Sequence, residues 1–281
     1  IYDIKSLRRL IREWKRADEK IALVPTMGNL HAGHLSLLSH ARGIAERTVV
    51  SIFVNPIQFG RGEDYEHYPS TLDADKEKLE HAGVDLVFAP NLKELYPGGI
   101  TKDTRVTVPA ISDILCGEFR PGHFAGVATV VIKLLNNVQP DFALFGEKDY
   151  QQLLVVRRLV QDLHIPTRIR AIPTVREADG LAISSRNVKL TPDQRAQAPT
   201  LYQALCAAAA AIRGGADVAG AQAEGARALA AAGFDRVDYF AVRDAETLAP
   251  VTDNRAAARV FAAAWFGEVR LIDNIAIESD A

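Results

Sequence analysis

Residues 24–42 read VPTMGNLHAGHLSLLSHAR, an apolar run that passes through a Gly-containing turn into a segment with helical spacing. Short apolar runs continue to alternate with helix-period segments as far as Pro173. This alternation is typical of β-α-β units that build a mostly parallel sheet. We therefore predict a Rossmann-like α/β fold, a doubly wound parallel sheet whose ligands bind at the carboxyl ends of the strands.

The apolar runs and the helical periodicity give the expected elements of this sheet. The predicted strands are Ile21–Val24, Val49–Val54, Leu86–Phe88, Phe142–Phe145 and Arg168–Ile172. The predicted helices lie near Ser6–Trp14, Leu35–Glu46, Leu72–Ala82, Ala125–Asn137 and Gln151–Leu163.

The texture of the chain changes after Pro173. Residues 174–187, TVREADGLAISSRN, read as a polar loop, and residues 197–232 are rich in alanine, the strongest helix former. Three apolar runs, at residues 237–244, 259–267 and 269–277, predict closing strands that are antiparallel because their connections are short. We predict two domains, residues 1–173 and a smaller α+β domain over residues 174–281.

Composition excludes several classes of protein. The chain has 281 residues and a formal net charge of -2, which offers no general attraction to nucleic acid or to an anionic membrane. Cys116 and Cys206 lack metal-type spacing, which argues against a disulfide framework or a structural zinc site. We find neither a membrane-spanning run nor the apolar core of a signal peptide, and so we expect a cytoplasmic location.

The opening stretch places two histidines, His31 and His34, around Gly33 where a helix begins. A helix N-terminus favours anions, and a glycine there lets the backbone and a nucleotide approach closely. One alternative is that one histidine caps the helix and the other packs in the core. A zinc site is a weaker alternative, because no third ligand lies at a recognisable spacing.

Two further strand ends carry polar groups. Asn55-Pro56 ends a strand, so Gln58 falls in a loop over the carboxyl edge, where its amide can both donate and accept. Gly146 to Asp149 follows another strand: Lys148 suits a phosphate, Asp149 can cap the next helix, and Gln152 faces back over the sheet edge. A solvated loop glutamine and a capped helix with surface charges are the alternatives.

Two loops offer compact sets of donors. The segment Ser184-Ser185-Arg186 provides two hydroxyls and a guanidinium, which are suitable donors to an oxyanion. Arg120 and His123 lie on a Gly-rich approach to a helix in RPGHFAGVATVV. Each of these could equally be a simple turn.

Taken together, these segments resemble the pantothenate synthetase family, the ATP-dependent ligases that join pantoate to β-alanine. The motifs PTMGNLHAGH, FVNPIQFG, RPGHFAGVATVV, FGEKDYQQL and PTVREADGLAISSRN appear in the family's order. The H-x-G-H pattern is also similar to that of the wider nucleotidylyltransferase superfamily. The chain departs from the family pattern at Ile57, where methionine is commoner, and at Lys189, where tyrosine is usual.

The resemblance implies the residues that bind each substrate. It assigns ATP to Thr26, Met27, Gly28, Asn29, Leu30, His31, Ala32, Gly33 and His34, to Gly146, Glu147, Lys148 and Asp149, and to Val175, Ile183, Ser184, Ser185 and Arg186. It assigns pantoate to Asn55, Gln58 and Gln152, with β-alanine near Gln58, and it makes His34, His31, Lys148 and Arg186 the catalytic set. The second domain would cover the active site.

The implied reaction passes through pantoyl adenylate, uses Mg²⁺ with ligands that the sequence leaves unknown, and releases AMP and pyrophosphate. The resemblance also implies a homodimer. From the charge, we expect no nucleic acid or membrane partner. Two alternatives stay open at this point: a nucleotidylyltransferase that stops at adenylyl transfer, and a non-catalytic nucleotide-binding module.

Overall fold

The computed structural model describes residues 1–60, 65, 68, 71–251 and 257–277, and these divide into two compact units. The first unit consists of Ile1–Gly146 and Gln151–Pro173, and the second of Glu147–Tyr150 and Thr174–Ala281. The short piece Glu147–Tyr150 therefore belongs with the C-terminal part of the chain. In the described part of the chain, no helix has the length and apolar character needed to cross a membrane.

The first unit is built on a five-stranded sheet with the order β3-β2-β1-β4-β5. Its strands are β1 (Ile21–Thr26), β2 (Arg47–Ile52), β3 (Leu86–Phe88), β4 (Phe142–Gly146) and β5 (Arg168–Ile172). Every pair is parallel, and Leu23 of β1 lies opposite both Val49 and Ala143. The predicted doubly wound parallel sheet is confirmed.

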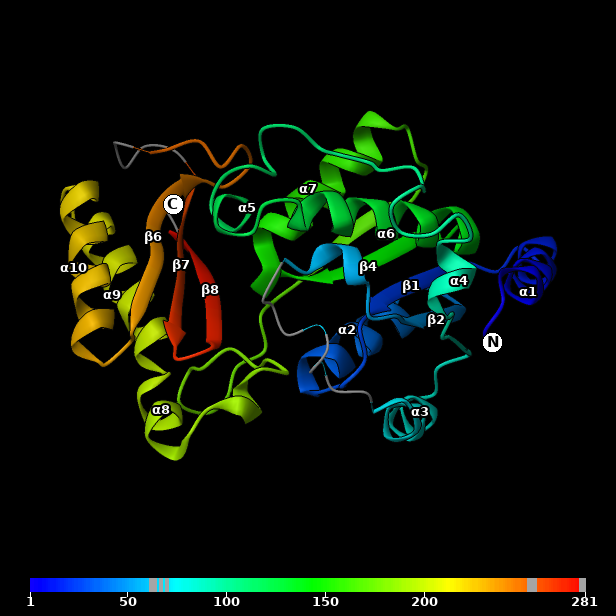
Figure 1. The fold of residues 1–281 in the computed structure, drawn as a ribbon, viewed down its shortest axis with the longest axis horizontal. Coiled ribbons are helices and arrows are strands. Elements are labelled where there is room, and N and C mark those ends of the chain that lie inside the picture. The colour runs from blue at the N-terminus through cyan, green and yellow to red at the C-terminus, as the bar shows by residue number, and fades with distance from the viewer. Residues whose placement is uncertain (61–64, 66–67, 69–70, 252–256, 278–281) are drawn as a thin grey trace. The chain divides into compact units, whose positions relative to one another are not determined.

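The helices of this unit pack on both faces of the sheet. They are α1 (Ile4–Arg16), α2 (Ala32–Arg42), α3 (Leu72–His81), α4 (Leu92–Leu95), α5 (Cys116–Phe119), α6 (His123–Val138) and α7 (Tyr150–Asp162), whose first residue belongs to the second unit. In Figure 1, α2 and α3 lie on one face of the sheet, and α6 and α7 lie on the other. Leu38 and Leu79 bury the first face against Val24 and Val50.

Most element boundaries differ from the sequence prediction by one to four residues, and two of these differences bear on the site. The second helix begins at Ala32 rather than Leu35, because His31 is already in extended backbone and serves as the N-cap. β2 ends at Ile52, two residues before the predicted Val54, and Pro56 opens the 3-10 turn η1 (Pro56–Gln58). Proline has no amide hydrogen and suits the first position of such a turn.

The order of the strands creates a switch point. From β1 the chain winds outward to β2 and β3, and it then returns to the other side of β1 to form β4 and β5. The carboxyl ends of β1 and β4 therefore lie side by side while their connections leave to opposite faces. Ligands of doubly wound sheets bind in this crevice.

The second unit packs helices on a three-stranded antiparallel sheet of order β6-β7-β8. Its elements are the 3-10 turns η2 (Glu147–Asp149) and η3 (Asn187–Lys189), the helices α8 (Pro192–Gln197), α9 (Thr200–Arg213) and α10 (Val218–Ala231), and the strands β6 (Arg236–Asp244), β7 (Ala258–Phe266) and β8 (Val269–Ile277). The helical reading of the Ala-rich stretch and the three antiparallel closing strands are confirmed.

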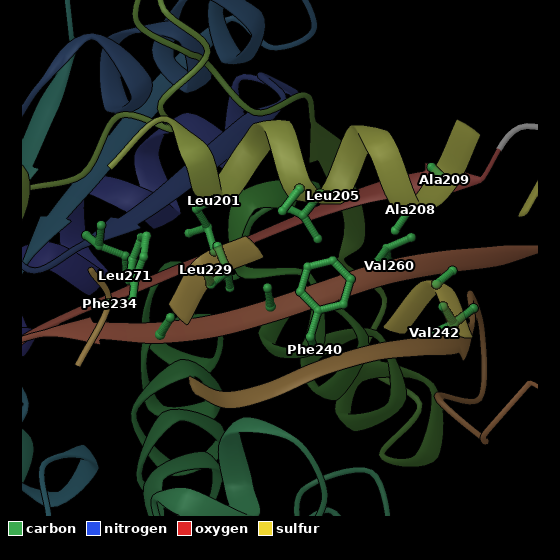
Figure 2. Packing of buried hydrophobic residues seen from close by; sticks show 14 of the residues in the cluster. Leu201, Leu205, Ala208, Ala209, Leu229, Phe234, Phe240, Val242, Val260 and Leu271 are labelled. Atoms are coloured by element: carbon green, nitrogen blue, oxygen red, sulfur yellow. The ribbon is translucent and has the colours of Figure 1, made fainter. Parts of the chain in front are cut away.

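Small residues bring these helices close to the sheet. Figure 2 shows Leu205 of α9 directed toward Phe240 of β6, and Leu201 of the same helix beside Leu229 of α10. A Cβ added to Gly225 of α10 would collide with the ring of Phe240. Full burial of a leucine or phenylalanine side chain stabilises a fold by roughly 1.5–3 kcal/mol. Because many such side chains are buried in this cluster, the second unit has a hydrophobic core of its own.

Candidate active site

The turn that follows β1 is held in a left-handed conformation at the carboxyl edge of the sheet. Gly28 has φ of +84° and Asn29 has φ of +51°. A Cβ on Gly28 would stand 3.1 Å from a carboxylate oxygen of Asp75 and 3.2 Å from Ile52, so glycine satisfies both the backbone and the space at this position.

Asp75 of α3 anchors this turn. Its fully buried carboxylate accepts hydrogen bonds from the backbone amides of Asn29, at 2.7 Å, and Leu30, at 2.8 Å. The hydroxyl of Thr71 donates to the same carboxylate at 2.9 Å. A buried carboxylate requires such donors, and loss of the carboxylate would leave the turn's amides unsatisfied.

Asp75 was missed by the sequence analysis, although a signal for it exists. It precedes Leu79 by four residues in a predicted helix, and residues four apart share a helix face. An acidic residue on the apolar face of a helix indicates a buried carboxylate with dedicated donors.

His31 and His34 lie where the sequence places them, at the start of α2. His31 is the N-cap residue, and its backbone amide donates to Nδ1 of His34 at 3.4 Å. The two imidazole ring centroids are 4.1 Å apart. A Cβ on Gly33 would approach the His31 ring to 3.0 Å, so this glycine makes room for the imidazole. The rings thus sit together at the positive end of a helix.

Asn55 and Gln58, which the sequence predicts as pantoate contacts, are both buried in the first unit. Asn55 Nδ2 donates to the side-chain oxygen of Gln58 at 3.1 Å, and Asn55 Oδ1 accepts from the Tyr96 hydroxyl at 2.9 Å. Burial raises the pKa of Tyr96, so that hydroxyl remains a donor at neutral pH. The alternative of a solvated loop glutamine at position 58 is wrong.

Gln58 also joins the two loops at this edge of the sheet. Its amide Nε2 lies 2.9 Å from the sulfur of Met27. His123 Nδ1 lies 2.7 Å from the Gln58 carbonyl oxygen, and Arg120 Nη1 lies 3.1 Å from His123 Nε2. The Gly-rich segment that leads into α6 therefore holds Gln58 through the side chains of Arg120 and His123. It is not merely a turn.

Gly126 lets α6 approach this loop. A Cβ at this position would come within 2.5 Å of the Ile57 carbonyl oxygen and 2.6 Å of the Gln58 Cα. The carbonyl oxygen of Gly126 in turn accepts from Asn55 Nδ2 at 3.1 Å. Glycine is required here by a close approach of backbone to backbone.

The end of β4 supplies the remaining positions of the first unit. Gly146 is the last residue of β4, and Gln152 lies in the first turn of α7, where it is partly buried. Its neighbour Gln151 is buried and bonds the backbone of Ile111, Ile114 and Cys116. Gln151 therefore has a structural role that the sequence does not separate from that of Gln152.

The other predicted ATP contacts belong to the second unit. Lys148 lies in η2 with its ammonium 3.8 Å from a carboxylate oxygen of Asp149. Asp149 is the last residue of η2, which continues directly into α7, so a 3-10 turn takes the place of the simple helix cap that the sequence predicts.

The SSR segment, residues Ser184 to Arg186, lies at the end of a short hairpin in the second unit. The amide of Ile183 donates to the carbonyl of Val175 at 3.0 Å, and Arg176 pairs with Ala182 as an antiparallel bridge. The amide of Arg186 then donates to the hydroxyl oxygen of Ser184 at 3.2 Å. The SSR segment is thus presented from a closed turn.

The predicted site residues of each unit, taken by itself, carry hydrogen-bond donors that suit anions. Across residues 1–60, 65, 68, 71–251 and 257–277, no group of three or more histidine, cysteine, aspartate or glutamate side chains is arranged to hold a metal. Histidines at a helix start, lysine, arginine, hydroxyls and amides all donate hydrogen bonds to phosphate or carboxylate oxygens.

A doubly wound sheet with a left-handed glycine turn and a histidine-bearing helix start at its switch point defines a class: α/β proteins that bind phosphate-bearing ligands at that edge. The sequence model described as pantoate-beta-alanine ligase matches residues 1–276. The pantothenate synthetases of Azotobacter vinelandii and Halorhodospira halophila are each 54% identical to the chain, over 98% and 96% of it and over 97% and 95% of their own lengths.

Solved structures agree with these relatives. Pantothenate synthetase from Thermus thermophilus superposes with a TM-score of 0.93 at 49% identity, covering 99% of this chain and 98% of its own. A pantoate-beta-alanine ligase from Francisella tularensis, complexed with beta-gamma ATP and beta-alanine, has a TM-score of 0.83 at 36% identity, with 99% and 97% covered. The chain belongs to the pantoate–β-alanine ligase family and is an enzyme, a ligase of pantothenate biosynthesis.

Proposed function

We propose that the chain condenses pantoate with β-alanine in two steps. A carboxylate oxygen of pantoate attacks the α-phosphorus of ATP, so that an oxygen–phosphorus bond forms, the bond from that phosphorus to the bridging oxygen breaks, and pyrophosphate leaves. The amine of β-alanine then attacks the acyl carbon, releases AMP and loses a proton. Activation is needed because a carboxylate resists attack by an amine. The observation that carries this proposal is the pair of histidines at the start of α2, beside the Gly28–Leu30 turn at the switch point.

In the first unit, His31 and His34 would donate to phosphate oxygens as negative charge develops on them. Donors that are already in place stabilise such charge without reorganising during the reaction. The two ring centroids are 4.1 Å apart, so both imidazoles lie at the same helix end. Asp75 would hold the Gly28–Leu30 turn for the nucleotide.

Pantoate would lie against the amides of Asn55, Gln58 and Gln152. An amide donates to a carboxylate and accepts from a hydroxyl, which are the two kinds of group that a hydroxy acid offers. The contact between Gln58 and Met27 supports a pantoate site next to the nucleotide turn.

In the second unit, Lys148, Ser184, Ser185 and Arg186 would hold the departing pyrophosphate. Lysine supplies a mobile point charge, whereas arginine supplies a planar fork of donors. Mg²⁺, when bound, would neutralise phosphate charge, held largely by phosphate oxygens and water as is usual for this ion. The homodimer and the cytoplasmic location stay predictions.

Isotope exchange tests the first step separately from the second. With Mg²⁺, ATP and pantoate, and without β-alanine, the purified chain is expected to exchange labelled pyrophosphate into ATP. His34→Ala is expected to lower the exchange rate by roughly 10²–10³, the loss typical for a removed oxyanion donor. Lys148→Ala is expected to lower it as well.

His40→Ala is the matched control. His40 lies on the same helix, is exposed, and has its Nδ1 2.8 Å from the Ser36 carbonyl oxygen. Exchange in this variant should equal that of the parent chain. Exchange without pantoate would indicate adenylylation of the protein and overturn the proposal, and so would normal exchange in a folded His34→Ala.

A further inference from the structure

Two consecutive polar residues, Asp273 and Asn274, are buried in the middle of β8. Successive side chains of a strand point to opposite faces, so the two residues reach different neighbours. Buried polar groups need hydrogen-bond partners, and each of these residues has several.

Asp273 holds the hairpin that carries the SSR segment. Its two carboxylate oxygens accept from the two terminal nitrogens of Arg176, at 2.5 and 3.0 Å. Arg176 also donates to the carbonyl of Gly180 at 3.1 Å, and its guanidinium lies 3.9 Å from the ring centroid of Tyr202. A bidentate pair of this kind fixes geometry as well as distance.

Asn274 holds the turn that carries Lys148. Its Nδ2 donates to the carbonyl oxygens of Glu147, at 2.9 Å, and Lys148, at 3.0 Å. Its Oδ1 accepts from Arg259 Nε at 2.9 Å, and the Arg259 guanidinium stacks 4.0 Å from the centroid of the Tyr150 ring. Both hydrogens of the amide are therefore committed to η2, and its oxygen is oriented by an arginine.

We propose that Asp273 and Asn274 form a common mount that fixes Lys148 and the Ser184–Arg186 segment relative to each other. Both segments are fastened to adjacent residues of one strand, only about 3.8 Å apart at Cα. Asp273 and Asn274 are positioning residues that act through other groups. This inference rests on the proposed function, because it assumes that both segments bind the phosphates of ATP.

The mount would preorganise the donors for the departing pyrophosphate. A side chain held about 1 Å from its productive position loses much of its effect, whereas groups fixed in advance need no rearrangement. Loss of the mount should therefore weaken the binding of ATP and pyrophosphate more than the binding of pantoate.

Asn274→Ala tests the arm that holds Lys148. We expect the KM for ATP to rise and the pyrophosphate exchange rate to fall, each by roughly tenfold or more. This is the lower end of the loss in affinity or activity that follows when a residue that orients a functional group is removed. The KM for pantoate should change by less than about twofold. A loss of folded protein alone would lower kcat without this difference between substrates.

Asn137→Ala is the matched control. Asn137 is also buried and also donates to a backbone carbonyl, that of Lys133 at 2.8 Å, but it lies in α6 of the first unit. Both substitutions should lower the melting temperature, and only Asn274→Ala should change the KM for ATP. Equal effects of the two on that KM would overturn the mount.

Two further variants complete the test. Arg259→Lys removes the bond that orients the Asn274 amide and keeps the charge, and Arg176→Lys breaks the bidentate pair with Asp273. In both variants the KM for ATP should rise more than the KM for pantoate, but by less than in Asn274→Ala. They also keep the proposal testable if Asn274→Ala does not fold. A change confined to kcat in both variants would contradict the mount.

A double-mutant cycle separates the mount from the proposed function. If Asn274 acts through Lys148, Asn274→Ala should have little further effect on the KM for ATP in a Lys148→Ala chain. A full, additive effect in that background would overturn the mount alone. If Lys148→Ala itself leaves both the KM for ATP and the exchange rate unchanged, the proposed role of Lys148 fails instead.

Discussion

Asp75 is the residue on which the nucleotide turn depends. We expect Asp75→Asn to lower the free energy of unfolding by roughly 1–3 kcal/mol, because an amide has one acceptor oxygen and leaves a backbone donor of Asn29 or Leu30 unsatisfied. The KM for ATP should rise as the Gly28–Leu30 turn loosens. Urea unfolding and steady-state kinetics measure the two effects.

Asp73→Asn is the control for this residue. Asp73 lies on the same helix with 94% of its side chain exposed, and it pairs with Lys76. An exposed pair contributes little, so the free energy of unfolding and the KM for ATP should both stay near those of the parent chain. A folded Asp75→Asn with parental stability would show that the carboxylate does not hold the turn.

At the scale of elements, two glycines near the start of helices give opposite expectations for the same substitution. Gly220→Ala in α10 adds a Cβ 3.4 Å from Asp217, close to ordinary contact, so alanine should stabilise the chain by up to about 1 kcal/mol through its helix propensity. Gly126→Ala in α6 drives a Cβ into the backbone of Ile57 and Gln58, and it should destabilise the chain.

The clash at Gly126 should also reach the substrate site. Because Asn55 bonds the carbonyl of Gly126 and Gln58 follows in the same turn, a shifted α6 moves both amides. We expect Gly126→Ala to raise the KM for pantoate more than that for ATP, and Gly220→Ala to change neither. Stability gained in both variants would mean that α6 and η1 can separate without cost.

For the whole molecule, each compact unit has its own core and its own tryptophan. Trp14 lies in α1 of the first unit, and Trp265 lies in β7 of the second, where its ring nitrogen donates to Asp238 at 2.9 Å. Leu205→Ala removes a fully buried side chain from the second core and should cost roughly 2–5 kcal/mol. We expect the denaturation midpoint reported by Trp265 to fall more than that reported by Trp14.

The single-tryptophan chains Trp14→Phe and Trp265→Phe make this comparison possible by fluorescence. In each single-tryptophan background, the chain that keeps Leu205 provides the reference denaturation midpoint for Leu205→Ala. Coincident transitions that shift together would show that the two units unfold as one cooperative system, contrary to the expectation.

The order of strands and helices could be predicted from the sequence alone. β3, β5 and β8 have the predicted bounds, and both histidines stand at the start of α2. These features follow from local patterns. Apolar periodicity, the proline at position 56 and the glycine at position 28 each act on only a few neighbouring residues of the chain. The segments that resemble the ligase family could be recognised for the same reason, because their residues are contiguous.

Only the tertiary structure decided which residues support those segments. Asp75 reaches Asn29 across 46 positions, Tyr96 reaches Asn55 across 41, and Asn274 reaches Lys148 across 126. The placement of Glu147–Tyr150 with the second unit is of the same kind. No local pattern encodes these pairs, because a hydrogen bond between distant residues depends on where the whole backbone brings them, and a buried polar side chain reveals its partner only when the fold is complete.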